Sequence, residues 1–346
     1  TVDAQNNTLL GTNAGDSFTG TDANNNTLIG YDAGTAITSG DENTVVGKSA
    51  GSRITTGGYN TCLGFSAGRG LTTQGYAVAI GYESLNDTSL SNNNHVALGF
   101  RSLYKTTSGA YNTGLGFRTL HENTTGASNV AVGYDALFNN TTAANNTAVG
   151  YYALVANTTG AYNTAVGAYS LDANTTAEAN TAVGYAALSS TATGQYNTAV
   201  GRSALANTAA SNSTAVGYEA LKSNTTGTDN IAVGKEALEE CTTGSNNVAL
   251  GKSALSVSTT AEKNTAVGKG SLAGITTGNS NTAFGYQSGL ANTTGNTNTA
   301  LGYETLCTNQ AGDRNCAVGF QSFYTMNPSG NADSYNTGLG FHTGYS

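Results

Sequence analysis

The chain has 346 residues, of which 10% are charged and 46 are glycine, and its formal net charge is -8. An average globular protein has about 25% charged residues, so this surface must depend on hydroxyl and amide groups for its solubility. The 13 Lys and Arg residues are spread thinly, which argues against nucleic acid as a partner. No apolar run approaches the ~20 residues that span a bilayer, so we expect no membrane insertion.

One short unit recurs along the whole chain. Its phrase Asn-Thr-Ala-Val-Gly ends in a glycine that returns every 17 residues, as at Gly133, Gly150 and Gly167. A fixed period of this length is typical of a solenoid. We therefore predict an all-β fold, a parallel β-solenoid or β-roll of about twenty 17-residue coils, forming an elongated rod. One repeat domain is expected over 1–346, with a loop insertion at 325–335, and the uncapped repeats at both ends suggest a processed product or a segment of something longer.

Each unit begins with a strand, represented by the coil that starts at Asn146. The columns of Thr147 and Val149 are β-branched or aliphatic in nearly every copy and lie on one face of a strand. We predict that this face points into the coil. The column of Ala148 between them is small throughout, which indicates that another backbone lies against it, from a second chain or from another turn of the same chain. Gly150 then allows a tight bend.

The rest of the unit returns the chain to the next strand. An aromatic residue or Lys follows the glycine and is expected to form a half-exposed ledge. An Ala-Leu pair such as Ala136-Leu137 comes next, with Leu predicted inside, although periodicity over so few residues does not separate a strand from a helical turn. The unit closes with Asn-Thr-Thr-Gly turn formers, and the Asn that heads each strand is predicted to stack in an amide ladder.

Three interior apolar side chains in each coil make a thin core. A slim solenoid of this kind would gain stability by packing its Ala column against identical copies, so we predict a homo-oligomer. Uncapped terminal repeats also favour joining of copies end to end into a filament.

The phrase Val130-Ala131-Val132-Gly133, like Val96-Ala97-Leu98-Gly99, resembles the repeated S-x-A-[IV]-G strand of trimeric autotransporter adhesin heads. Longer copies of the form N-T-A-[IV]-G-Y-x-A-L-x-x-N-T-T-G look like repeats of phage tail-fibre and other extracellular fibre proteins. The resemblance covers the whole chain. It implies a parallel β-roll with three chains side by side, hence a homotrimer, in a fibre that is extracellular and displayed at a cell surface or on a virion.

Few residues point to chemistry. We predict no catalytic residues, no metal site and no cofactor, since His95, His121 and His342 occupy different columns and are interpreted as surface or corner residues. Asp16, Asp22, Asp32 and Asp41 are too irregularly spaced for a cation site. Cys307 and Cys316 could form a disulfide across one coil, or be two buried small side chains. Six N-glycosylation motifs fall in the Asn-Thr-Thr loop and would line one edge of the rod, unless they are only turn formers: Asn123, Asn140, Asn157, Asn174, Asn224 and Asn292.

These patterns predict a structural fibre or filament subunit, not an enzyme, that associates with itself. The alternative is an adhesin or tail-fibre module that recognises surface glycans through the aromatic ledge or through the insertion around Pro328. A third hypothesis is ice binding by a Thr array; it is disfavoured if the single Thr column of the strand lies inside.

Overall fold

The computed structural model describes residues 3–19, 22–86, 91, 94–326 and 334–344. Over these residues every regular element is a β-strand of three residues, joined by turns and bends. The chain therefore forms the predicted all-β solenoid. Of the predicted insertion at 325–335, residues 327–333 lie outside the described part.

The chain's internal contacts group it into two units, Thr1–Thr176 and Ala177–Ser346. The single repeat domain expected over 1–346 stays a prediction, and each unit is described by itself. The first unit contains β1 (Thr8–Leu10), β2 (Thr27–Ile29), β3 (Thr44–Val46), β4 (Thr61–Leu63), β5 (Val78–Ile80), β6 (Val96–Leu98), β7 (Thr113–Leu115), β8 (Val130–Val132), β9 (Thr147–Val149) and β10 (Thr164–Val166). The second contains β11 (Thr181–Val183), β12 (Thr198–Val200), β13 (Thr214–Val216), β14 (Ile231–Val233), β15 (Val248–Leu250), β16 (Thr265–Val267), β17 (Thr282–Phe284), β18 (Thr299–Leu301), β19 (Cys316–Val318) and β20 (Thr337–Leu339).

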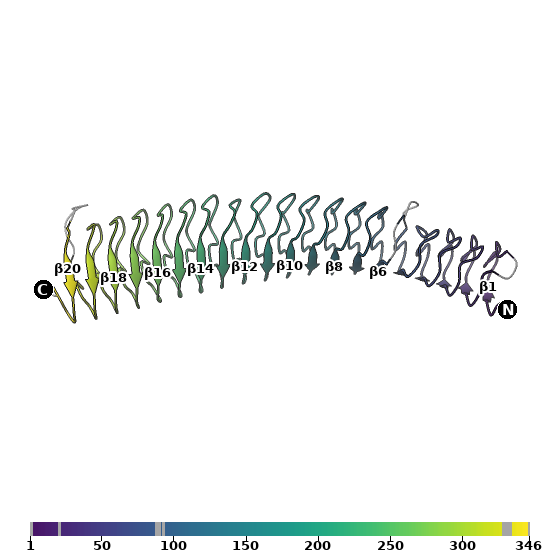
Figure 1. Cartoon of the computed structure of the whole chain (residues 1–346), viewed down its shortest axis with the longest axis horizontal. Coiled ribbons are helices and arrows are strands. Elements are labelled where there is room, and N and C mark those ends of the chain that lie inside the picture. The colour runs from purple at the N-terminus through teal and green to yellow at the C-terminus, as the bar shows by residue number, and fades with distance from the viewer. Residues whose placement is uncertain (1–2, 20–21, 87–90, 92–93, 327–333, 345–346) are drawn as a thin grey trace. The chain divides into compact units, whose positions relative to one another are not determined.

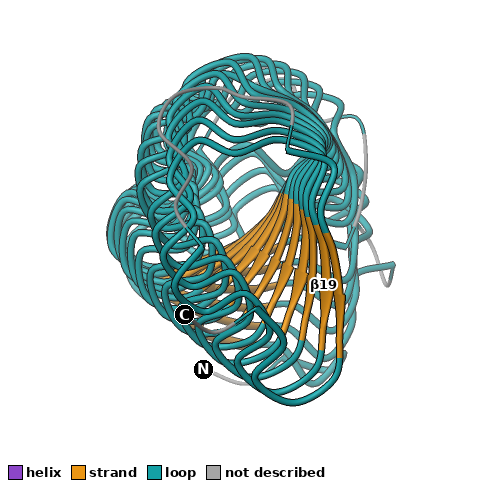
Figure 2. Cartoon of the chain, turned by 90° about the vertical axis from the view of Figure 1, so that its left-hand side faces the viewer, coloured by secondary structure: helices purple, strands orange, loops and turns teal. Residues whose placement is uncertain are grey.

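Within each unit, successive strands pair in parallel and in register (Figure 1). In the first unit Thr147 lies opposite Thr164 and Ala148 opposite Ala165, and in the second Ile231 lies opposite Val248. Each coil therefore stacks on the next with equivalent residues aligned. The strands lie side by side along one wall of the coil, and turns and loops make up the rest of its outline (Figure 2).

The prediction for the two faces of the strand is wrong. The middle residue of each strand is buried, and the first and third residues are half-buried or exposed, as in β9 and β14. Thus Ala148 faces the coil interior, whereas Thr147 and Val149 face outward. The Leu of the returning segment already fills the interior of the coil. No space remains there for a large side chain from the strand, which is why the middle strand column is small. The Ala column is therefore not a surface for another chain.

Leu137 and its equivalents fill the interior as predicted, and Leu137 is fully buried. The segment that carries them is neither a strand nor a helical turn. Asp135 (φ 53°) and Leu137 (φ 52°) are both left-handed, and their N–H groups bond to neighbouring coils on opposite sides, Asp135 to the Phe117 carbonyl and Leu137 to the Ala153 carbonyl, both at 3.0 Å. A left-handed non-glycine residue costs roughly 1–2 kcal/mol, which these inter-coil bonds help to offset.

The glycine after each strand is required for two reasons, its backbone conformation and the close approach of the next coil. Gly150 has φ 141°, and a Cβ placed on it would come within 2.5 Å of the Gly167 carbonyl oxygen in the next coil. A side chain at this position would both strain the backbone and push the coils apart. The column of glycine that reveals the period in the sequence is therefore the column on which close stacking depends.

The predicted amide ladder is present at the head of the strands. The Asn43 side chain donates from Nδ2 to Asn26 Oδ1 (3.1 Å), and Asn60 donates in the same way to Asn43 Oδ1 (3.0 Å). Each Nδ2 also donates to a carbonyl of its own coil, Gly57 for Asn43. These amides are buried, so the ladder satisfies polar groups inside a core that has few apolar side chains.

Candidate functional site

Four of the six predicted glycosylation residues, those of the first unit, form a second buried ladder, and Asn224 and Asn292 are buried singly in the second unit. Asn140 donates from Nδ2 to Asn123 Oδ1 (2.8 Å) and to the Ala143 carbonyl (3.0 Å), and Asn157 donates to Asn140 Oδ1 (2.9 Å). Their side chains are at most 2% exposed: Asn123, Asn140, Asn157, Asn174, Asn224 and Asn292. The Nδ2 atom that a glycan would modify is therefore engaged inside the folded coil. The structure favours the interpretation of Asn-Thr-Thr as a turn with an interior amide, and a glycan could be attached only before folding.

Cys307 and Cys316 are free thiols, as are Cys62 and Cys241. Cys316 starts β19 at an outward position and is half-buried, whereas Cys307 is buried. The two thiols are not bonded in this structure, and the disulfide stays a prediction. Burial raises the pKa of the Cys62 thiol to about 12 and that of Cys241 to about 11, so these two are inert interior residues.

The histidines do not share one environment. His95 was expected at the surface or a corner, but it is fully buried at the head of β6, in the column of the amide ladder. Burial lowers its pKa to about 4, against a weaker opposite effect of the Asn112 backbone. His342 is half-buried near the end of the described chain, and its Nε2 lies 2.6 Å from Gln321 Oε1.

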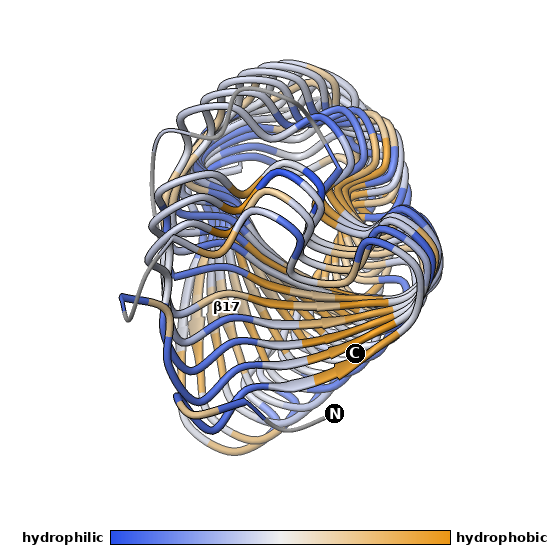
Figure 3. Ribbon diagram, turned by 90° about the vertical axis from the view of Figure 1, so that its right-hand side faces the viewer, coloured by the Kyte–Doolittle hydropathy of each residue, from blue (hydrophilic) through white to orange (hydrophobic). Residues whose placement is uncertain are grey.

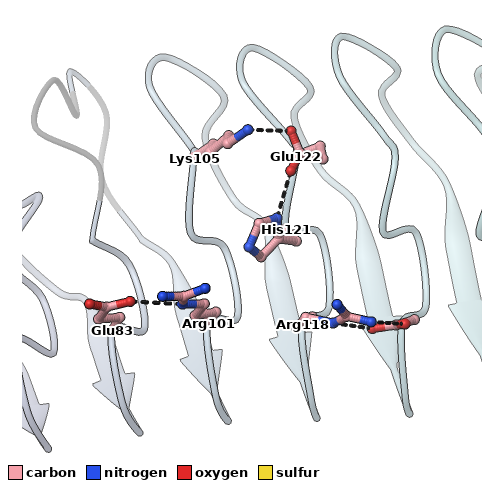
Figure 4. A network of polar contacts seen from close by, with 7 residues as sticks. Glu83, Arg101, Lys105, Arg118, His121 and Glu122 are labelled. Carbon is pink, nitrogen blue, oxygen red and sulfur yellow. Dashed lines mark hydrogen bonds and ion pairs between the residues drawn. The ribbon is translucent and has the colours of Figure 1, made fainter.

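Charged side chains form short bridges between coils in the first unit (Figure 4). Arg118 binds both carboxylate oxygens of Asp135, with Nε to Oδ1 at 2.9 Å and Nη2 to Oδ2 at 2.5 Å. Glu122 accepts from Lys105 Nζ at 2.6 Å, and its other oxygen lies 2.8 Å from His121 Nδ1. Each bridge joins neighbouring coils or neighbouring residues, so the network links successive coils of the first unit.

Aromatic side chains form the half-exposed ledge that was predicted. In the first unit the rings that follow the repeating glycine stack from coil to coil, with Phe100 and Phe117 centroids 5.0 Å apart and Phe117 and Tyr134 centroids 4.9 Å apart. A second stack places His121 between Tyr104 and Phe138. Offset stacking at this spacing is favourable, so the ledge covers the seams between coils.

The largest regular surface is the outward side of the strands, here called the strand face: the first and third residues of every strand. None of these residues is charged. Many are large and exposed, such as Ile231 (42% exposed) and Phe284 (54%), and apolar residues follow the strand wall in Figure 3. An extended apolar surface on a soluble protein is unusual and marks an interaction site. Sequence reasoning missed this face because it placed the same residues inside.

No candidate metal centre is found among the described residues. They contain no group of three or more His, Cys, Asp or Glu side chains that could hold a metal ion, and none of them forms a helix long and apolar enough to cross a bilayer. Comparison with protein-family models gives no match, and neither does comparison with characterised proteins. The candidate site must therefore be judged from its own geometry.

Proposed function

We propose that this chain is a structural fibre or filament subunit, without enzymatic activity, and that copies of it associate through the strand face. The observation that carries the proposal is an in-register column of uncharged outward residues along all ten strands of a unit, as in the pairing of Val149 with Val166. Face-to-face packing of such sheets is a common way to bury an apolar surface, at about 10 Å between sheets.

The strand face together with the adjoining aromatic ledge is large enough for a stable contact. Ten strands about 4.8 Å apart extend ~43 Å, and the five residues from the first strand position to the ledge extend ~17 Å. One unit therefore offers roughly 700 Å² per partner, or about 1,400 Å² for a pair, within the standard range of about 1,200–2,000 Å² for specific interfaces. No strand-face residue in this contact is charged, and the ledge of the first unit contributes one lysine, Lys48.

The resemblance to adhesin heads and tail fibres supports three chains per assembly and display at a cell or virion surface. A uniform coil suits a shaft, because each repeat adds the same length and the same contact surface. End-to-end joining into a filament belongs to the same proposal.

Sedimentation tests the association. We expect the chain to be oligomeric at micromolar concentration and to become monomeric with Val132→Glu and Val166→Glu, which place buried charge in the interface. The control carries the same charges on exposed loop residues, Thr125→Glu and Thr159→Glu, and should stay oligomeric. A folded wild-type monomer across the concentration range would rule out the proposal. Labelling of intact cells or virions with an antibody to the chain tests its surface display.

Ice binding is a second candidate because the Thr column proved to face outward. Thr147 and Thr164 lie opposite each other in register, so rigid hydroxyl and methyl groups repeat every ~4.8 Å along the unit. A regular array of this kind can hold water in ordered positions. The measurement is thermal hysteresis: a freezing point depressed below the melting point, and lost with Thr147→Glu and Thr164→Glu, would favour this candidate, whereas no hysteresis in the wild type would exclude it.

A further inference from the structure

Two neighbouring coils of the first unit depart from the repeat in the same way. Gly58-Tyr59 and Gly75-Tyr76 are the two places in the chain where a Gly-Tyr pair comes directly before the strand-head column. The two rings are stacked, with centroids 5.0 Å apart and planes within 2°. They are 51% and 63% exposed, so the stack presents its surface to solvent instead of sealing a seam.

A groove of about 270 Å³ lies beside these rings. It is lined by the two tyrosines, by the backbone of the two glycines and by polar residues of three successive loops: Ser39, Thr56, Thr73 and Asp41. The volume is close to the lower limit of small-molecule sites, about 300 Å³. Loops elsewhere in this column carry Ala, Gln, Ser or larger residues in place of glycine, and their side chains occupy the corresponding space.

The glycines also leave backbone donors open. Where this column carries Asp, a carboxylate oxygen accepts from the N–H of the preceding coil: Asp41 Oδ1 from Asn24 N at 2.7 Å, and Asp313 Oδ1 from Asn296 N at 2.6 Å. Gly58 and Gly75 supply no such acceptor. Within the described part of the chain nothing accepts from the N–H groups of Asp41 and Gly58.

Asp41 and Gly58 both line the groove, so their N–H groups lie beside it. A Cβ built on Gly58 would lie 3.5 Å from Asp41 N, so the space that a side chain would occupy adjoins the Asp41 backbone. Asp41 bonds to Asn24 through Oδ1, which leaves Oδ2 as an acceptor at the same edge of the groove. The site therefore offers donors, acceptors and an aromatic surface within one short stretch.

We propose that this groove, between the Tyr59–Tyr76 stack and the Ser39, Thr56 and Thr73 loops, binds a neutral saccharide. A sugar ring has an apolar C–H side that packs on an aromatic ring and hydroxyls that both donate and accept. Open N–H groups and threonine hydroxyls match its oxygen atoms, and Asp41 matches its hydroxyl protons. An anionic sugar is disfavoured by the carboxylates of Asp41 and Glu42, and a simple cation gains nothing from the N–H donors.

The test uses the whole chain on an array of neutral gluco-, galacto-, manno- and N-acetylglucosamine oligosaccharides, with sialylated and sulfated counterparts and choline alongside. Calorimetry then measures the affinity for the neutral oligosaccharide that is best retained. We expect Tyr59→Ala with Tyr76→Ala to weaken this affinity about tenfold or more, because two stacked rings are lost. The control is Tyr111→Ala with Tyr162→Ala, two equally exposed residues (64%) of the same column that follow alanines; its affinity should not change.

Gly58→Ser provides a second variant, whose Cβ requires a small shift of the Asp41 carbonyl oxygen 2.9 Å away. Serine occupies this column natively at Ser211 and Ser245, where its Oγ accepts from the preceding coil's N–H at 3.0 Å. It should cap the Asp41 N–H, fill the groove and abolish saccharide binding, while Ala161→Ser leaves binding intact. Sedimentation of Gly58→Ser should match the wild type, which separates this site from the association proposed for the strand face. The proposal is overturned if no neutral oligosaccharide is retained, if acidic sugars or choline bind better, or if the control variants lose binding equally.

Discussion

The buried amide ladder makes a quantitative prediction for Asn247→Ala. Asn247 donates from Nδ2 to the Ala261 carbonyl at 2.8 Å, and its Oδ1 accepts from Asn264 N at 3.0 Å. Both partners are buried, and alanine would leave that carbonyl and that N–H without a partner. An orphaned buried group costs about 1–3 kcal/mol, so the free energy of unfolding should fall by roughly 2–6 kcal/mol.

Denaturant unfolding followed by circular dichroism measures this change, and hydrogen exchange locates it in the coils of Asn247 and Asn264. Thr243→Ala is the matched control, because Thr243 is exposed only four residues before Asn247 and its loss should change the free energy of unfolding by less than about 0.5 kcal/mol. Asn247→Ser should fall between the two, since Ser213 occupies this column natively and its Oγ accepts from Asn230 N at 3.4 Å. If Asn247→Ala were no more destabilising than Thr243→Ala, the ladder would not stabilise the fold.

Three further predictions address the glycine column, a buried histidine and the direction of the strand. Gly234→Ala should unfold at a markedly lower temperature than Gly270→Ala. A Cβ on Gly234 would lie 2.6 Å from the backbone of the next coil, whereas the nearest neighbour of a Cβ on Gly270 is a flexible side chain at 3.4 Å. Similar thermal unfolding midpoints for the two variants would contradict close stacking at Gly234. For His95, with a folded pKa lowered to about 4 from 6.5, the unfolded chain takes up the proton first as the pH falls. Stability is therefore complete above about pH 6.5 and decreases by about 3 kcal/mol toward pH 4, and His95→Asn should remove this decrease in pH-dependent unfolding; an unchanged profile would refute it. Cys316 should react with iodoacetamide faster than Cys62 in the native protein, since one faces outward and the other is buried with its pKa raised to about 12; equal rates by mass spectrometry would contradict the assignment of the two strand faces.

Much of the coil was predictable because the repeated copies show which residue types each position of the unit accepts. The 17-residue return of glycine predicted the stacking, and the structure shows why, since Gly150 has both a left-handed φ and a close neighbour in Gly167. The Leu column was placed inside correctly, and the strand-head Asn column was correctly predicted to form an amide ladder. Each prediction rested on a residue type that has few alternatives at its position.

The direction of the strand was predicted wrongly although the sequence contained a signal for it. In the early coils the middle strand residue is large, Leu28 or Val45, and the position of the returning Leu is then glycine, Gly34 or Gly51. A Cβ on Gly34 would lie 2.9 Å from Leu28 Cδ2, and one on Gly51 would lie 3.2 Å from Val45 Cγ2. This exchange of volume shows that the two columns face each other across the interior.

The sequence by itself determined the period, the parallel stacking and the residues on which that stacking depends, because these follow from local geometry repeated in register. The tertiary structure alone decided whether the Asn-Thr-Thr amides are accessible and where paired glycines open a groove. Those properties depend on how much space the opposite wall of the coil leaves, and no single column of the sequence records the distance between two walls.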